Sequence, residues 1–271
     1  MLKNKLITYC YKSKYFSCRI SIDYRVYKLD IEFFDLVFNS FNRNQNDSNK
    51  SENIYVIFDT NTTISDNIIF IKPNYIDWKF QFLIDLENKL SNKISKNSII
   101  FHASAIEHNG NGIMFCGERY SGKTTITQKL LIESSSKYID DDMVILSEKN
   151  IWGFSFPAKL RINHGNSYII KESSTQNRYL INYSNISKSP VKIKHIIFPQ
   201  YSLSKFNEIK QIFGSQAYFM LIQNIKGGEG NLKILNEQLI NICNSTKFWT
   251  IKYSNNDFMM RKIIPIINGN Y

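Results

Sequence analysis

Gly117-Glu118-Arg119-Tyr120-Ser121-Gly122-Lys123-Thr124 is a complete phosphate-binding loop, and no other stretch constrains the fold as strongly. An apolar run precedes it and a helix-like run follows it, which is the strand–loop–helix setting that the pattern requires. The glycines allow backbone N–H groups to turn inward toward phosphate oxygens. Lys123 supplies a positive charge for the β- and γ-phosphates, and the Thr124 hydroxyl can ligate Mg²⁺. We therefore expect ATP, or alternatively GTP, to bind with Mg²⁺ at this loop and at the neighbouring Thr125. The alternative is a glycine turn that happens to precede a lysine.

The composition is that of a soluble globular protein. The chain has 271 residues, of which 43% are hydrophobic and 21% charged, which is enough for one large domain or two smaller ones. No apolar run approaches the ~18 residues of a membrane span, and the N-terminal residues lack the features of a secretory signal. The four cysteines are scattered without metal-like spacing, so we expect no disulfide framework and a cytoplasmic location.

The charge balance bears on the partners. There are 34 basic and 23 acidic residues, a net charge of +11. The sequence contains no long basic tract and no nucleic-acid motif, so we expect no nucleic-acid partner. Dispersed positive charge favours a nucleotide or an acidic peptide, although it is equally typical of a solvated basic surface.

The first part of the chain, residues 1–97, is predicted to be a strand-rich N-terminal domain that forms a possible substrate-binding layer. Alternating apolar and polar residues, with many β-forming residues, predict strands. A polar, turn-rich stretch predicts a loop at Phe41–Ser51, and the helical spacing of apolar residues predicts a helix within Asn74–Leu90. The predicted strands are Ser17–Val26, Ile54–Phe58 and Ile68–Ile71.

The second part, residues 98–271, is predicted to be the phosphate-loop domain. A strand at Ile99–Ile106, a turn at His108–Gly112 and a strand at Ile113–Cys116 lead into the loop. Further strands are predicted at Tyr138–Leu146 and Ile193–Phe198, and helices at Asn207–Phe219 and Gly230–Cys243. The mixture of strands and helices predicts an α/β or mixed α+β class.

Three consecutive acids, Asp140, Asp141 and Asp142, follow the helix after the loop. A triphosphate site needs an additional acid near the metal, and on a strand these side chains alternate in direction, so they are expected to have different roles. An exposed acidic turn is the alternative. His102 precedes the loop on the neighbouring strand and is a candidate partner for an aspartate, although a structural role is also compatible with its position. His164 and His195 are interpreted as structural.

The order of four segments resembles the HPr serine kinase/phosphorylase family, in particular the stand-alone members of peptide natural-product gene clusters. These segments are Phe101-His102-Ala103-Ser104-Ala105, the hairpin, the phosphate loop and Ile139-Asp140-Asp141-Asp142-Met143-Val144. The segment Phe156–Ile162 is similar to a downstream segment of that family. The resemblance covers about residues 98–200. It lacks the family's glycine-rich segment after the acidic pair, which argues against HPr itself as the substrate.

The resemblance implies an HPr-kinase-like core and roles for specific residues. Asp141 corresponds to the general base and Asp142, with Thr124, to the Mg²⁺ site, although these two roles are interchangeable at this stage. His102 corresponds to the histidine beside the pair, Lys123 to the catalytic lysine, Asp140 is an additional acid, and Arg161 is a candidate phosphate clamp. A homo-oligomer is implied by the resemblance alone.

The function expected from these features is ATP- and Mg²⁺-dependent transfer of a phosphoryl group to a serine or threonine hydroxyl of a peptide or small protein, as in the tailoring of a ribosomally made peptide. The alternatives are a kinase that acts on the hydroxyl of a small molecule, and a nucleotide-dependent switch or ATPase without a phosphoryl acceptor.

Overall fold

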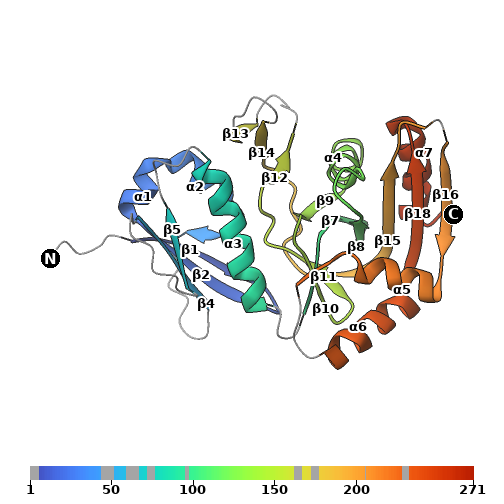
Figure 1. The fold of residues 1–271 in the computed structure, drawn as a ribbon, viewed down its shortest axis with the longest axis horizontal. Coiled ribbons are helices and arrows are strands. Elements are labelled where there is room, and N and C mark those ends of the chain that lie inside the picture. The colour runs from blue at the N-terminus through green and yellow to red at the C-terminus, as the bar shows by residue number, and fades with distance from the viewer. Residues whose placement is uncertain are drawn as a thin grey trace. The chain divides into compact units, whose positions relative to one another are not determined.

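The computed structural model describes residues 6–43, 52–58, 67–71, 77–94, 98–161, 167–171, 177–204, 206–227 and 232–271. The chain divides into two compact units, the first formed by Met1–Ile94 and Phe156–Asn182, the second by Ser95–Ser155 and Tyr183–Tyr271. Helices and strands are mixed in both units (Figure 1). The predicted mixed α/β class is therefore confirmed.

The first unit contains a five-stranded sheet with the order β3-β1-β2-β4-β5 and a three-stranded sheet with the order β12-β14-β13 in its described part. Its elements are β1 (Leu6–Lys12), β2 (Ser17–Asp23), α1 (Tyr24–Leu29), α2 (Ile31–Val37), β3 (Asn42–Arg43), β4 (Glu52–Phe58), β5 (Ile68–Ile71), α3 (Trp78–Ile94), β12 (Ala158–Leu160), β13 (Tyr168–Lys171) and β14 (Arg178–Ile181).

Alternating apolar residues form the core of the first unit. Ile20 and Ile22 of β2 lie opposite Ile54 and Val56 of the parallel strand β4, and all four side chains are buried. The period of two places them on one face of the sheet, where they can pack against helices.

The segment Phe156–Asn182 packs within the first unit although it is distant from it in sequence. The Phe156 ring stacks on Phe41, with 5.8 Å between their centroids, and Lys159 Nζ lies 2.6 Å from Glu87 Oε1. The sequence did not predict this insertion, because the apolar pattern of a segment does not determine which partner the segment packs against. The domain boundary between residues 97 and 98 remains a prediction.

The second unit contains a ten-stranded sheet in the described part of the chain. The order along its main path is β17-β6-β10-β11-β15-β8-β7-β9, with β18 beside β15 and β16 beside β18. Its elements are β6 (Ile99–Phe101), β7 (Ala103–His108), β8 (Asn111–Cys116), α4 (Lys123–Glu133), β9 (Lys137–Asp141), β10 (Val144–Ser147), β11 (Asn150–Trp152), β15 (Val191–Tyr201), β16 (Glu208–Ile212), α5 (Gly214–Ile222), β17 (Ile225–Gly227), α6 (Leu232–Ser245), β18 (Lys247–Tyr253) and α7 (Asn256–Ile267).

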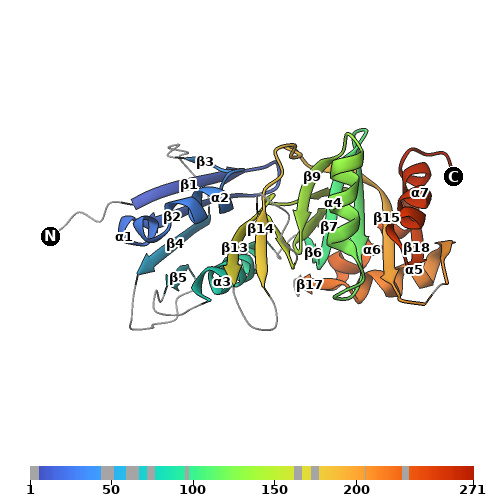
Figure 2. The same cartoon turned by 90° about the horizontal axis from the view of Figure 1, so that it is seen from above.

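Two apolar clusters hold this sheet between pairs of helices. Ile126 and Leu130 of α4 join Met259 and Ile263 of α7 in one cluster, whereas residues of α5 and α6 belong to the other. Figure 2 shows α4 lying along β7 and β9. The strands that lead into the phosphate loop are therefore buried, because helices cover both faces of the sheet.

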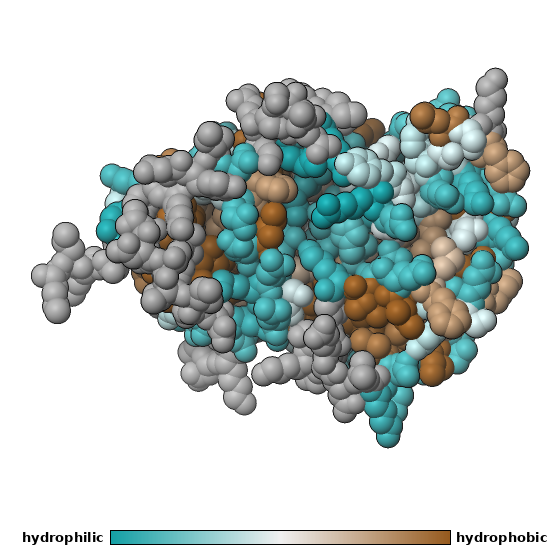
Figure 3. All heavy atoms as spheres, in the orientation of Figure 1, coloured by the Kyte–Doolittle hydropathy of each residue, from teal (hydrophilic) through white to brown (hydrophobic). Residues whose placement is uncertain are grey.

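The helices α5 and α6 also present apolar side chains to solvent. Phe219, Ile222, Ile234 and Ile240 are exposed, and apolar spheres gather over this region (Figure 3). Surfaces of this kind occur at protein–protein contacts, and the predicted homo-oligomer remains a prediction. None of the helices in the described residues combines the length and apolarity that a membrane span needs.

Several sequence predictions differ from the structure. The strand predicted at Ile99–Ile106 is divided at His102 into β6 and β7. The strand predicted at Ser17–Val26 ends at Asp23. The Asp23 carboxylate caps the N-terminal end of α1 by accepting a hydrogen bond from the Arg25 N–H. The helix predicted at Asn207–Phe219 is a strand, β16, followed by α5. The strand predicted at Tyr138–Leu146 is broken into β9 and β10. Within the loop predicted at Phe41–Ser51, Asn42 and Arg43 form the short strand β3, whereas residues 44–51 and His164 lie outside the described residues.

Candidate active site

The register of three strands brings the candidate residues to one edge of the sheet. The strands β7 and β8 form a hairpin in which Ala103 pairs with Cys116, so His102 and Gly117 leave the hairpin side by side. The strand β9 runs antiparallel to β7 and pairs Asp141 with Ser104. The acids, the histidine and the phosphate loop therefore meet at the same edge, as the sequence predicted for the hairpin.

The loop enters α4 through Gly122, which has a left-handed backbone with φ of 101°. A β-carbon at this position would lie 1.8 Å from the Tyr253 hydroxyl oxygen, so no other residue fits. Gly122 also lacks a side-chain cap, which leaves the N-terminal end of α4 open to an anion.

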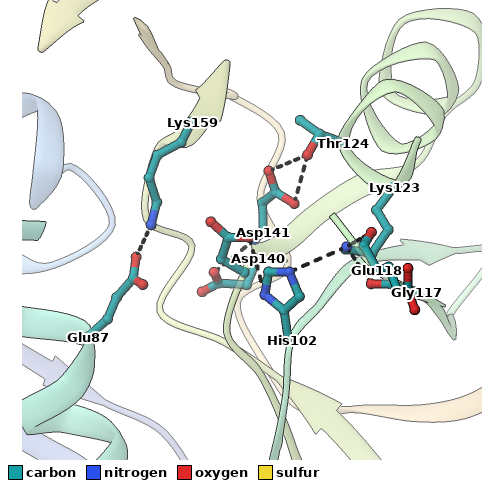
Figure 4. A network of polar contacts seen from close by, with 10 residues as sticks. Glu87, His102, Gly117, Glu118, Lys123, Thr124, Asp140, Asp141 and Lys159 are labelled. Carbon is teal, nitrogen blue, oxygen red and sulfur yellow. Dashed lines mark hydrogen bonds and ion pairs between the residues drawn. The ribbon is translucent and has the colours of Figure 1, made fainter. Parts of the chain in front are cut away.

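Lys123 lies across the loop that precedes it. Its Nζ donates hydrogen bonds to the carbonyl oxygens of Gly117, at 2.7 Å, and Glu118, at 3.0 Å. The same Nζ lies 3.4 Å from His102 Nε2 (Figure 4). The ammonium is thus held at the point where the loop and His102 meet.

Thr124 and Asp141 form the second contact of the site. The Thr124 hydroxyl donates to Asp141 Oδ2 at 2.9 Å, with Oδ1 at 3.3 Å. Asp141 is buried, with 5% of its surface exposed, and is the last residue of the strand β9. Two oxygen ligands suitable for Mg²⁺ therefore lie at the first turn of α4.

Asp142 faces His102 rather than Thr124. Its backbone is left-handed, with φ of 81°, and its N–H donates to the Ala103 carbonyl at 2.9 Å. This break in the strand turns the carboxylate toward the imidazole, with 3.6 Å between Asp142 Oδ1 and His102 Nδ1. The two side chains are 30% and 32% exposed, so an incoming molecule can reach them.

Burial and nearby cations lower the pKa of His102 below its ordinary value of 6.5. Burial is the largest cause; Lys123, Lys226 and Arg119 act in the same direction, and Asp142 opposes them. The imidazole is therefore neutral at neutral pH. Because Nε2 faces the Lys123 ammonium, its proton belongs on Nδ1, toward Asp142.

Asp140 has a structural position. Its carboxylate accepts hydrogen bonds from the N–H groups of Phe154, at 2.7 Å, Ser155, at 3.0 Å, and Asp141, at 2.8 Å. The approach is so close that a β-carbon on Gly153 would lie 2.5 Å from Asp140 Oδ2. The Asp140 carboxylate is buried and bound to the backbone, as a structural acid is, and its candidate role in the chemistry remains a prediction.

The remaining loop residues differ in exposure. The side chains of Glu118, Arg119, Tyr120 and Thr125 are exposed. Ser121 Oγ is buried and has no hydrogen-bond partner. A buried hydroxyl of this kind needs a partner, and a phosphate oxygen in the loop would supply one.

The sequence also indicated Arg161 as a candidate phosphate clamp and His195 as a structural residue. Arg161 belongs to the first unit, so its role as a phosphate clamp remains a prediction. His195 is buried in the second unit, where its Nδ1 accepts a hydrogen bond from the Trp249 indole at 3.3 Å. Burial lowers the pKa of His195 to about 4, as expected of a structural histidine.

Two residues at the site were not predicted from the sequence. The Tyr253 hydroxyl lies against Gly122, and the charge of Lys226, in β17, acts on His102. The strand β17 reaches this edge because it pairs with β6 and because the Asn224 carbonyl accepts a hydrogen bond from the His102 N–H. No local pattern around either residue indicates this, since both contacts depend on strand pairing.

No protein-family model matches the chain, and no curated protein matches its sequence. Among solved structures, the chain is similar to the HPr(Ser) kinase/phosphatase from Coxiella burnetii, with 10% sequence identity and a TM-score of 0.29. The similarity covers 63% of this chain and 94% of that one. An identity and a TM-score this low do not assign a function.

Proposed function

We propose that this chain is an ATP- and Mg²⁺-dependent kinase that transfers the γ-phosphoryl group to a serine or threonine hydroxyl of a peptide or small protein. The main support is the position of two separate acids around Lys123. Asp141 is bonded to Thr124, and Asp142 faces His102. Phosphoryl transfer requires a metal-side acid and a group that accepts the hydroxyl proton, and these two positions match the two requirements.

The loop and Lys123 bind the triphosphate in this proposal. The uncapped end of α4 and the lone Ser121 hydroxyl fit phosphate oxygens. Lys123 exchanges its two carbonyl acceptors for the β- and γ-phosphates. This exchange costs little because one set of charge-assisted bonds replaces another.

Thr124 and Asp141 would hold Mg²⁺. No group of three or more metal-ligating residues occurs in the described part of the chain. Mg²⁺ at nucleotide sites needs no such group, because it takes one or two protein oxygens and completes its shell with phosphates and water. When bound, it would neutralise charge on the β- and γ-phosphates.

Asp142 accepts the proton of the acceptor hydroxyl, and His102 orients the carboxylate through its Nδ1–H. The bond between the acceptor oxygen and the γ-phosphorus forms as the bond from that phosphorus to the β–γ bridging oxygen breaks, which releases ADP. Asp142 suits this role better than Asp141 because it is more exposed and faces His102, whereas Asp141 accepts the hydrogen bond of the Thr124 hydroxyl. We therefore assign the two roles in the opposite order to the sequence prediction.

The choice of a peptide as the acceptor rests on the sequence resemblance and on the positive net charge of the chain. The net charge of +11 favours an acidic partner through long-range attraction. The strands β3 and β5 lie at the two ends of the described five-stranded sheet, and a sheet edge can accept an extended peptide. This is the basis for assigning substrate recognition to the first unit.

The test is transfer from ATP with Mg²⁺ to a library of serine- and threonine-containing peptides, monitored by the mass gain of one phosphoryl group. We expect Asp142→Asn to lower transfer by about 10²- to 10⁴-fold while nucleotide affinity is retained. The matched control, Asp257→Asn, changes an exposed acid of α7 and should leave transfer unchanged. ATP hydrolysis that Asp142→Asn does not alter, without transfer to any peptide, would contradict the proposal.

A further inference from the structure

The carboxyl ends of three parallel strands lie beside the phosphate loop. The strand β15 is parallel to β8 on one side and to β18 on the other. Ile197 of β15 pairs with Phe115 of β8, so the last residues of β15 extend beyond the end of β8. Ligands of open α/β sheets bind at such carboxyl ends.

Tyr201, the last residue of β15, is attached directly to the loop. Its N–H donates to the Ser121 carbonyl at 3.1 Å. Its ring packs edge-on against the Tyr253 ring, with 5.5 Å between centroids, and the Tyr253 hydroxyl lies against Gly122. These contacts fix the Tyr201 ring beside the N-terminal end of α4.

Apolar surface continues from Tyr201 across the end of β18. Tyr201 is 45% exposed, and Leu203 and Phe206 are 89% and 59% exposed. The segment is anchored, because the Ser202 N–H donates to the Tyr253 carbonyl at 2.9 Å and Asn207 Oδ1 accepts from the Ser254 N–H at 2.9 Å. Three large apolar side chains are thus exposed on one anchored segment, and exposed apolar patches occur at ligand-binding sites.

The sheet order decides which part of a nucleotide reaches this surface. Within the sequence β15-β8-β7-β9, the acids and His102 lie on the β7 and β9 side of the loop, and Tyr201 lies on the β15 side. A triphosphate whose terminal phosphate faces Asp142 extends its nucleoside toward the opposite side. A nucleobase has an apolar face that stacks on aromatic rings.

We propose that Tyr201, with Leu203 and Phe206, forms the nucleobase-binding surface of this protein, with the base stacked on the exposed Tyr201 ring. This inference rests on the proposed nucleotide function and adds the contact that selects a nucleotide over a bare polyphosphate. Stacking on an aromatic ring favours purines over pyrimidines because the purine face is larger.

The test compares Mg²⁺–ATP with Mg²⁺–tripolyphosphate by isothermal titration calorimetry. Stacking contributes about 1–3 kcal/mol, so Tyr201→Ser should weaken ATP binding by about 5- to 150-fold and leave tripolyphosphate binding within twofold. Tyr201→Phe keeps the ring and should bind ATP like the wild type. The matched control is Phe213→Ser, which also removes an exposed ring, with 68% of Phe213 exposed. Phe213 follows Ile212, which pairs with the beginning of β18, whereas Tyr201 lies beside the end of β18.

The outcomes separate this inference from the proposed function. If the wild type binds both ligands but Tyr201→Ser weakens neither, or weakens both equally, the nucleobase surface is wrong and the phosphate site stands. If Tyr201→Ser changes only the KM for a peptide acceptor, the surface binds the acceptor and the inference is overturned. If the wild type binds neither ligand, both the proposed function and this inference are wrong.

Discussion

The Thr124 hydroxyl donates a hydrogen bond to Asp141 Oδ2 over 2.9 Å, from the first turn of α4 to the end of β9. The contact exists because β9 pairs with β7, which pairs in turn with the strand that delivers the loop. It places a hydroxyl and a carboxylate where the metal of a nucleotide site would lie.

Asp141→Asn should weaken Mg²⁺-dependent nucleotide binding by about 10- to 100-fold, because the amide keeps the hydrogen bond but loses the charge that orients the Thr124 hydroxyl toward the metal. The affinity for nucleotide in EDTA should change little. Calorimetric titrations with and without Mg²⁺ measure the difference. Equal loss of affinity in both conditions would show that Asp141 does not act through the metal.

The activity should depend on the protonation of His102. Because burial and the surrounding cations lower its pKa, the imidazole gains a proton only at a pH below its ordinary value of 6.5. The added charge then faces Lys123 and stabilises ionised Asp142, which makes the carboxylate a weaker base. We expect kcat/KM to fall as the pH decreases through that lowered pKa.

His102→Gln tests this dependence. The variant should be less active at pH 7.5 and should lose the part of the acid-side decrease that His102 causes, which a profile of kcat/KM against pH measures. An acid-side decrease identical to that of the wild type would exclude His102 as the group that titrates.

Asp140 should contribute to stability rather than to the reaction. Asp140→Ala removes the acceptor of the Phe154 and Ser155 N–H groups inside the protein, so we expect unfolding to require at least about 2 kcal/mol less free energy. Asp142→Ala, two residues further on and 30% exposed, should change the free energy of unfolding by less than about 1 kcal/mol. Urea unfolding of both variants measures this, and equal stability of the two would refute the assignment.

The pair of Glu87 and Lys159 should stabilise the attachment of the inserted segment to the first unit. Their side chains are only 6% and 12% exposed, so Glu87→Gln leaves a buried ammonium without this carboxylate, at a cost of about 3 kcal/mol. The pair Lys93–Glu52, with Glu52 50% exposed, is the control, and Glu52→Gln should cost less than about 1 kcal/mol. Similar losses in the two variants would show that burial does not distinguish the pairs.

The sequence predicted the local backbone structure around the candidate site, because that structure depends on short sequence patterns. The phosphate loop has a fixed pattern, and a two-residue turn at Asn109–Gly110, with φ of 50° and 73°, makes the β7–β8 hairpin that brings His102 to it. Local periodicity also predicted the strands β4 and β5 and most of α3.

The features that the sequence did not predict depend on contacts between segments that are distant in the chain. The break between β9 and β10 is set by the Asp142 N–H bonding to Ala103, and it separates the two acids that the sequence treated as one strand. The strand β16 was predicted as a helix because its apolar spacing is ambiguous until β18 is available as a partner. The return of Phe156–Asn182 to the first unit has no local signal.

The most direct test of the account is a crystal structure with Mg²⁺ and a non-hydrolysable ATP analogue. We expect the β- and γ-phosphates within the loop beside Lys123, Mg²⁺ near Thr124 and Asp141, and the γ-phosphate facing the Asp142–His102 pair. A nucleotide bound away from the loop, or a γ-phosphate that points away from Asp142, would contradict it.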